Sequence, residues 1–243
     1  MSKVYADKIE PRESTTDVTI GTSTNTVTLA GNDLRAGTVK DSGGNTLWVS
    51  DGAGTLSSVN AGLQGNLKLL STQTASSATS VSFTTDIDST YDVYCFKFID
   101  IGPSNDNRDF MFNGSIDSGS NYNVTKTTTY FEAYHGVDGS STSFGYGTSY
   151  DLAQSTAYQI LARDAGGGAD ECIVGEFWLY GPSSTTYAKH FHSTIQYHHY
   201  FSNNQSQQNY VAGYFNTTSA INAIDFKMDS NTFDGIIKMY GLL

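Results

Sequence analysis

Short apolar runs recur along most of the chain and constrain its fold more than any other feature of the sequence. Clusters of Ser, Asn, Asp and Gly separate one run from the next, as turns separate strands. The runs occupy residues 66–71, 79–84, 91–101, 108–113, 127–134, 157–162, 171–180, 185–201, 209–215, 221–228 and 235–241. This spacing predicts an all-β fold, an antiparallel β-sandwich of the jelly-roll type.

The stretch 221–243 reads as a hairpin, because two apolar runs flank a polar connection that contains glycine. In its second run Ile237 and Met239 share one face, while Tyr240 lies on the other. A strand that is apolar on both faces is typical of the interior of a packed sheet. The run 91–101 shows the same two-sided pattern, so both are predicted to be central strands.

Residues 1–64 differ from the rest, since they contain no Phe and few other large apolar side chains. A segment this poor in bulk cannot build a core of its own. Its short strand-like pieces favour strands that pair with other copies, and a flexible linker is the alternative. We expect an N-terminal anchor and stem over residues 1–64 and a sandwich over 65–243. The apolar residues expected to mediate attachment and association are Val18, Ile20, Val27, Leu29 and Leu34.

The chain carries a net charge of −11 and no run of Lys or Arg. A nucleic-acid-binding surface needs clustered basic side chains, so we expect no nucleic-acid partner. The start of the sequence has no apolar signal-peptide core, and no apolar run reaches the roughly 18 residues of a spanning helix. We therefore expect a soluble protein that is made in a cytoplasm and does not insert into a membrane. Cys95 and Cys172 lie in apolar runs and are expected to be buried thiols, although a disulfide between them stays an alternative.

Two polar segments allow two interpretations each. Residues 151–163 have apolar positions that fit a short helix ended by the glycines at 166–168, or a strand. The segment Asn105–Asp109 offers oxygen ligands, but it lacks the residue order of an EF-hand, so we expect a turn rather than a calcium site.

Four of the five histidines lie within residues 189–201. His190 and His192 would share one face of a strand, which makes them weak candidates for a metal site. No Cys or Glu lies nearby to complete a zinc ligand set, so a polar strand face is the expected role. If three copies met here, symmetry could bring equivalent histidines together.

Glu132, Glu171 and Glu176 lie in strand-like runs beside aromatic residues, but no feature singles out an acid pair for glycoside hydrolysis. The sequence also lacks a Gly-x-Ser-x-Gly elbow and a phosphate-binding loop. We therefore predict no catalytic residue, no cofactor and no enzyme activity.

The segment 130–150 is rich in aromatic residues next to Ser, Thr and Gly. Rigid rings beside small polar groups make good recognition surfaces, and they would suit sugars. The alternative is that the rings pack in the core or at a subunit interface. The predicted ligand-binding residues are Tyr130, Tyr134, His135, Tyr146 and Tyr150, with Phe144 beside them.

Several stretches resemble virion proteins of tailed bacteriophages. Residues 67–75, 91–101, 213–216 and 221–241 resemble their jelly-roll-type domain, and residues 8–11, 18–21 and 39–47 resemble the beginnings of phage fibres. The resemblance implies a homotrimer whose N-terminal segment is attached to the particle and whose C-terminal domain points outward. It implies no catalytic motif.

Together these features predict a virion protein, a short trimeric fibre that presents a β-sandwich to host-surface glycan. The first alternative is a capsid decoration protein whose N-terminal arm clamps capsid subunits. The second alternative, from another class, is a glycan-cleaving enzyme.

Overall fold

The computed structural model describes residues 37–41, 43–53, 56–57, 59–60, 65–200 and 205–243. The chain divides into two compact units, Met1–Asn60 and Ala61–Leu243. The regular elements of the described residues are all β-strands, which confirms the prediction of an all-β fold. The residues expected to mediate attachment lie outside the described part, namely Val18, Ile20, Val27, Leu29 and Leu34.

The described strands of the first unit are β1 (Thr38–Lys40), β2 (Thr46–Ser50) and β3 (Leu56–Ser57). They form an antiparallel sheet in the order β1-β2-β3. The Asp41 side chain shapes the β1–β2 turn, because it accepts the backbone N–H groups of Gly43 and Asn45 at 2.9 and 2.8 Å. These three strands pair with one another within one chain.

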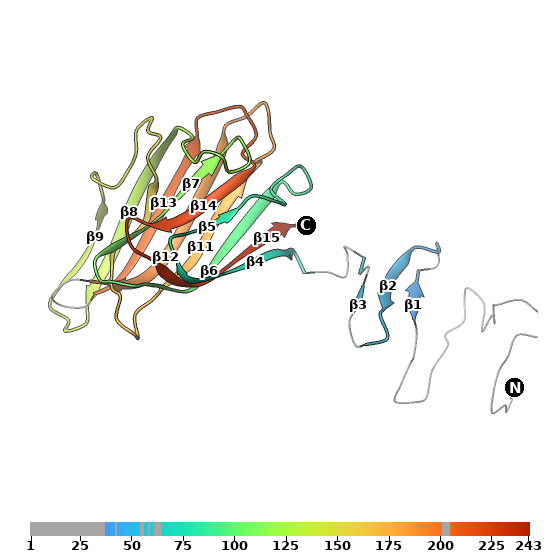
Figure 1. The fold of residues 1–243 in the computed structure, drawn as a ribbon, viewed down its shortest axis with the longest axis horizontal. Coiled ribbons are helices and arrows are strands. Elements are labelled where there is room, and N and C mark those ends of the chain that lie inside the picture. The colour runs from blue at the N-terminus through green and yellow to red at the C-terminus, as the bar shows by residue number, and fades with distance from the viewer. Residues whose placement is uncertain (1–36, 42, 54–55, 58, 61–64, 201–204) are drawn as a thin grey trace, which may run out of the picture. The chain divides into compact units, whose positions relative to one another are not determined.

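Twelve described strands form the second unit (Figure 1). Each predicted apolar run coincides with one of these strands, whereas β9 lies outside the predicted runs. The strands are β4 (Leu67–Ala78), β5 (Ser80–Phe83), β6 (Val93–Pro103), β7 (Arg108–Ser115), β8 (Lys126–Gly136), β9 (Thr142–Tyr146), β10 (Gln159–Ala165), β11 (Ile173–Tyr180), β12 (Lys189–His199), β13 (Gln205–Phe215), β14 (Ala223–Met228) and β15 (Phe233–Leu242).

Eight of these strands pair in the order of a jelly roll. β4 pairs with β15, β5 with β14, β6 with β11, and β7 with β10, so the chain forms one long antiparallel hairpin. The hairpin is rolled up, because β15 also pairs with β6 and β14 also pairs with β7. The prediction of an antiparallel, jelly-roll-like sandwich is therefore confirmed.

The other four strands extend one layer of the sandwich. β12 adds to β11, and β13, β8 and β9 follow in that order. The larger layer is β4-β15-β6-β11-β12-β13-β8-β9, and the smaller layer is β10-β7-β14-β5. The two layers meet where Ala165 of β10 pairs with His199 of β12, so the sheet closes on itself along that side.

Buried aromatic rings fill the space between the two layers. Phe112 of β7 lies 4.5 Å from Phe177 of β11, measured between ring centroids. Phe226 of β14 lies 5.0 Å from Phe98 and 5.4 Å from Phe96, both on β6. Tilted and edge-to-face contacts of this kind add to the free energy gained by burying the rings.

The predicted strand faces are observed in the central strands. β15 lies between β4 and β6, and its residues Ile237 and Met239 are fully buried. In β12, Phe191, Ile195 and Tyr197 are buried, as expected from their common parity.

Residues 151–163 contain no helix, so the helical alternative is wrong, and β10 begins within this segment. β8 supplies the hydrogen bonds that a helix would otherwise make. The Thr128 hydroxyl accepts the N–H of Leu152 at 2.8 Å, and Lys126 and Ser155 exchange backbone hydrogen bonds of 2.9 and 3.0 Å. The tertiary partner therefore decides the conformation of a segment whose own pattern is ambiguous.

Cys95 and Cys172 are both free thiols. Cys95 is fully buried in β6, as predicted, and burial raises its pKa to about 12. Cys172 is only half-buried just before β11, so its predicted burial is partly wrong.

Candidate binding face

The solvent-facing side of the eight-stranded layer, which we call the outer face, carries most of the exposed aromatic rings of the second unit. Side chains alternate along a strand, so each strand supplies every second residue to this face. The pairing register then places outward residues of neighbouring strands in rows across the layer. One such row contains Thr194, Tyr210, Phe131 and Tyr146, on β12, β13, β8 and β9.

Three aromatic residues of that row, Tyr210, Phe131 and Tyr146, form what we call the aromatic row. Their side chains are 40%, 39% and 44% exposed. The rings of Phe131 and Tyr146 meet edge to face, with their centroids 5.3 Å apart. Phe144, two residues before Tyr146 on the edge strand β9, is 73% exposed. Adjacent exposed rings of this kind mark an interaction surface more often than scattered single ones do.

The alternation of β8 and β9 separates the residues that the sequence grouped as one ligand-binding set. His135 and Tyr146 lie on the outer face. Tyr130 and Tyr134 have the opposite parity and point between the layers, where Tyr130 is fully buried. Tyr150 packs on Tyr130, with ring centroids 5.2 Å apart. The structure thus places only two of the five on the surface that carries the aromatic row.

The strand positions around the aromatic row are polar and carry no Asp, Glu, Lys or Arg, while the Asp151 carboxylate contacts the row from the segment after β9. The Tyr146 hydroxyl donates a hydrogen bond of 2.7 Å to Asp151 Oδ2, which orients the ring and raises the pKa of Tyr146. Such a surface can stack its rings on the apolar parts of a ligand and hydrogen-bond the hydroxyls around them. The outward positions of β13, β8 and β9 are Ser206, Gln208, Tyr210, Ala212, Tyr214, Thr127, Thr129, Phe131, Ala133, His135, Thr142, Phe144 and Tyr146.

His190 and His192 lie on the outer face of β12, and each contacts aromatic rings. His192 stacks on Trp178 at 6.4 Å and on Tyr180 at 5.7 Å, and the Tyr180 hydroxyl lies 3.3 Å from its Nδ1. His190 packs against Tyr214 at 5.8 Å. Within the described ranges, no three His, Cys, Asp or Glu side chains are grouped so that they could hold a metal ion. Both histidines therefore contribute to the aromatic surface of this layer.

On the inner side of β8, a buried ion pair connects this strand to β10. Arg163 donates from Nε and Nη2 to Glu132 at 2.8 and 3.1 Å, and from Nη1 to Asp164 at 2.7 Å. Burial disfavours the guanidinium charge, but the hydrogen bonds and charges of Glu132 and Asp164 outweigh burial and raise the pKa of Arg163. Gln207 of β13 also donates to Glu132, at 3.0 Å. These bonds hold the strands that carry the aromatic row.

The other two glutamates considered for catalysis lie elsewhere. Glu176 of β11 pairs with Lys97 of β6 on the outer face. Glu171 accepts the N–H of Gly168 at 2.8 Å, and its Oε1 lies 3.7 Å from His198 Nδ1. Each carboxylate thus has partners of its own, and the three occupy separate places.

The segment Asn105–Asp109 leads from β6 into β7 and forms the expected turn. Its carboxylates accept backbone N–H groups. Asp106 accepts from Gly167 at 2.8 Å, and Asp109 accepts from Asp164 at 2.9 Å.

A buried lysine lies where β8 begins, and the sequence pattern did not predict it. Lys126 Nζ donates to Asn113 Oδ1 at 2.8 Å and to the Val124 carbonyl at 3.2 Å, and it lies 5.9 Å from the centre of the Phe215 ring. Lys126 and Asn113 are both fully buried. Burial lowers the pKa of Lys126 to about 7. The contact ties the end of β7 to the start of β8.

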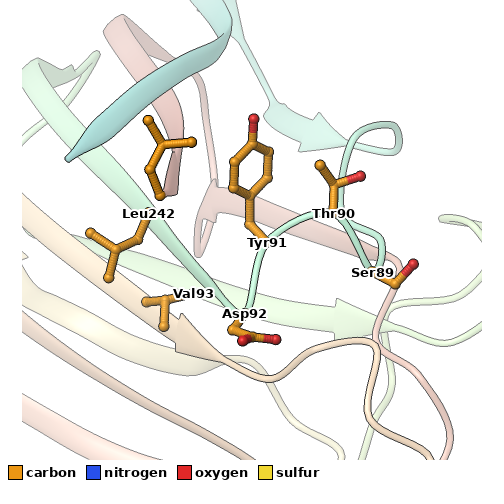
Figure 2. Close-up of a pocket in the computed structure, with 7 residues that line it drawn as sticks. Ser89, Thr90, Tyr91, Asp92, Val93 and Leu242 are labelled. Atoms are coloured by element: carbon orange, nitrogen blue, oxygen red, sulfur yellow. The ribbon is translucent and has the colours of Figure 1, made fainter. Parts of the chain in front are cut away.

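A pocket of about 510 Å³ adjoins the β15–β6 end of the outer face (Figure 2). Figure 2 shows the Tyr91 ring standing between Leu242 and Thr90. This ring packs directly over Gly241, where an added Cβ would lie 2.5 Å from it. The pocket is lined by Ser89, Thr90, Tyr91, Asp92, Val93, Leu242 and Leu243.

The fold and the outer face define an antiparallel jelly-roll protein with an exposed aromatic surface. No family model, no curated protein and no solved structure matches the chain. In the described residues, no helix is both long and apolar enough to cross a lipid bilayer.

Proposed function

We propose that the chain is a non-enzymatic virion protein of a tailed phage, a homotrimeric fibre that is attached through its N-terminal segment and binds host-surface glycan. The aromatic row carries the binding part of this proposal. Tyr210, Phe131 and Tyr146 offer three neighbouring rings for the CH faces of sugars, and the Gln, Ser and Thr side chains around them can bond to sugar hydroxyls. The virion part of the proposal rests on the sequence resemblance to phage fibres and their jelly-roll domains.

The row is flat and exposed, so a single site gains little beyond the cost of ordering a sugar. Three linked copies raise the effective concentration of the second and third sites. Avidity of the homotrimer, rather than the affinity of one site, is the proposed source of host attachment.

The test is binding of the full-length protein to polysaccharide and envelope material from its host. Phe131→Ala and Tyr146→Ala should each weaken binding at least about fivefold, since the stacking of a nucleic-acid base on one aromatic side chain, a comparable contact, contributes on the order of 1–3 kcal/mol. Tyr187→Ala is the matched control, because Tyr187 is an exposed tyrosine in the β11–β12 connection, outside the row. Equal binding by all four proteins would refute the assignment of the row.

Two further observations separate the alternatives, and a third tests the anchor. Imaging of labelled protein on intact particles should place it on the tail, and a capsid location would favour the decoration function instead. Release of sugar during the binding assay would contradict the non-enzymatic proposal. Removal of residues 1–30 should abolish incorporation into particles if the N-terminal segment is the anchor.

A further inference from the structure

An apolar band crosses the half of the outer face that lies away from the aromatic row. Register places its five residues opposite one another on β4, β15, β6, β11 and β12. Leu69 at one end is half-exposed, and Cys95 in the middle is fully buried although it points outward, because larger neighbours cover it. The band consists of Leu69, Tyr240, Cys95, Trp178 and His192.

We propose that the apolar band is the surface through which the sandwich packs against a second copy of this chain. The inference rests on the proposed homotrimer and names the interface that the sandwich contributes to it. Apart from Lys97 and Lys238, the outward positions of β6 and β15 near the band are apolar, and strands with apolar side chains on both faces are typical of a layer packed on both sides. A second sheet laid on this face at the usual spacing of about 10 Å would provide the missing layer.

The composition of the band suits a protein partner better than a sugar. The neighbouring row of outward residues, two positions further along β11 and β6, contains Tyr180 of β11 opposite Val93 of β6. The hydroxyl and carboxamide groups that surround the aromatic row are few here. Aromatic and aliphatic residues with few charges are typical of the core of an interface between identical chains.

Charge favours another copy of the same acidic chain. Lys97 and Lys238 lie directly opposite each other on β6 and β15, and like charges at such positions repel. Glu176 neutralises Lys97, whereas Lys238 forms no ion pair among the described residues. The chain has 24 acidic residues and a net charge of −11, so a second copy can bring a carboxylate to Lys238. The net negative charge makes two copies repel each other elsewhere, but this part of the face carries two lysines and adds little to that repulsion.

The pocket beside the band makes this part of the surface concave. Val93 and Leu242 have the same outward parity as Cys95 and Tyr240, so the hollow in Figure 2 continues the band. A hollow of about 510 Å³ can receive a protruding side chain from the partner. Interfaces between identical chains reach the packing density of protein interiors through such insertions.

The test uses Trp178 as a reporter inside the band. The chain has two tryptophans, so the Trp48→Phe full-length protein leaves Trp178 as the single tryptophan, which can be excited at wavelengths where tyrosine does not absorb. In one chain alone Trp178 is only half-buried. We expect acrylamide to quench it several-fold less in the homotrimer than after dilution to monomer.

His192→Glu puts a second carboxylate next to Glu176 and should weaken association at least about 100-fold in sedimentation, since it buries an unpaired charge. Tyr187→Glu, outside the band, is the control and should leave association unchanged.

Three outcomes would overturn the proposal in distinguishable ways. A trimeric mass with freely quenched Trp178 would refute the band as the interface and would leave the proposed homotrimer intact. A monomeric mass at every concentration would refute both the homotrimer and the band. A monomer whose Trp178 is shielded would show that another part of the same chain covers the band.

Discussion

Arg163 of β10 and Glu132 of β8 form a bidentate ion pair between two strands that are not paired with each other in the sheet. β8 pairs with β13 and β9, whereas β10 pairs with β7 and β12. The two side chains are 14% and 17% exposed. Phe131, which precedes Glu132 on β8, points to the opposite side and belongs to the aromatic row. The ion pair therefore connects the strand that carries the row to the smaller layer of the sandwich.

Arg163→Ala should lower the free energy of unfolding by about 2–3 kcal/mol. Removal of one partner from a fully buried pair costs about 3–5 kcal/mol, and the remaining solvent contact of Glu132 reduces this value. Arg108→Ala is the matched control, because Arg108 pairs with the more exposed Asp229. An exposed pair contributes at most about 1 kcal/mol. Urea unfolding of both variants measures the difference, and equal losses would contradict the structural role given to Arg163.

The free energy of unfolding of the wild type should increase relative to that of Lys126→Met as the pH rises from about 7 to about 9.5. Its folded pKa is about 7, against about 10.4 in an unfolded chain. In this window the unfolded chain binds more protons, so a higher pH favours folding through this group. We expect the difference between the two proteins to shift by about 3 kcal/mol.

The comparison with Lys126→Met removes the effects of other groups. The raised pKa values of Cys95 and of buried tyrosines such as Tyr130 act in the opposite direction, but they do so in both proteins. Urea unfolding at both pH values gives the required four free energies. A constant difference would show that Lys126 is charged in the folded state.

Gly213→Ala should destabilise the sandwich, because the new Cβ would lie 2.4 Å from the Thr127 carbonyl oxygen on the neighbouring strand. Overpacking of this kind costs about 1–3 kcal/mol. Gly145 of β9 has open space around it, so Gly145→Ala should change stability by less than about 0.5 kcal/mol. Thermal unfolding of the two variants tests the contrast between a closed and an open strand position.

Residues 65–243 should fold without the segment that precedes them. The buried apolar residues of the described chain all lie between Ala75 and Met239, so the core is contained in this fragment. We expect a β-type circular dichroism spectrum and one cooperative thermal transition. A molten product would show that the first unit is required for folding.

Glycan binding through the aromatic row should depend little on salt. The outward positions of β13, β8 and β9 carry no Asp, Glu, Lys or Arg. A change from about 50 mM to about 500 mM salt should therefore alter avidity less than about twofold. A steep loss of binding would point to a charged ligand at another place on the chain.

Alternation of apolar residues predicted the central strands, because β6, β12 and β15 bury the side chains that their pattern selects. It fails in β13, where Gln207 and Asn209 are buried and Tyr210 is exposed. The amide nitrogens of both residues find buried partners, since Gln207 donates to Asn209 Oδ1 at 3.0 Å and Asn209 donates to the Tyr197 hydroxyl at 3.1 Å. A polar residue that is buried for this reason has the same appearance in a sequence as an exposed one.

The candidate site was predicted only in part, for a similar reason. Tyr130 and Phe131 are neighbours in sequence, but the parity of β8 sends them to opposite sides. The aromatic content of the segment 130–150 drew attention to His135 and Tyr146 and not to Phe131. Tyr210 joins the row through the long-range pairing of β13 with β8, which no local pattern contains. Register, rather than composition, decides which rings meet.

The position of β15 between β4 and β6 sets an order of events for folding and assembly. The sandwich has a gap between the edges of β4 and β6 until β15 has been synthesised and inserted, and such non-local pairing is slow. Unpaired edges accept a matching strand from any copy nearby. In a homotrimer the copies are close neighbours, and β15 of one chain fits the gap of another as well as its own. In the proposed homotrimer each chain would therefore have to close its own gap before the copies meet, or the assembly would exchange strands.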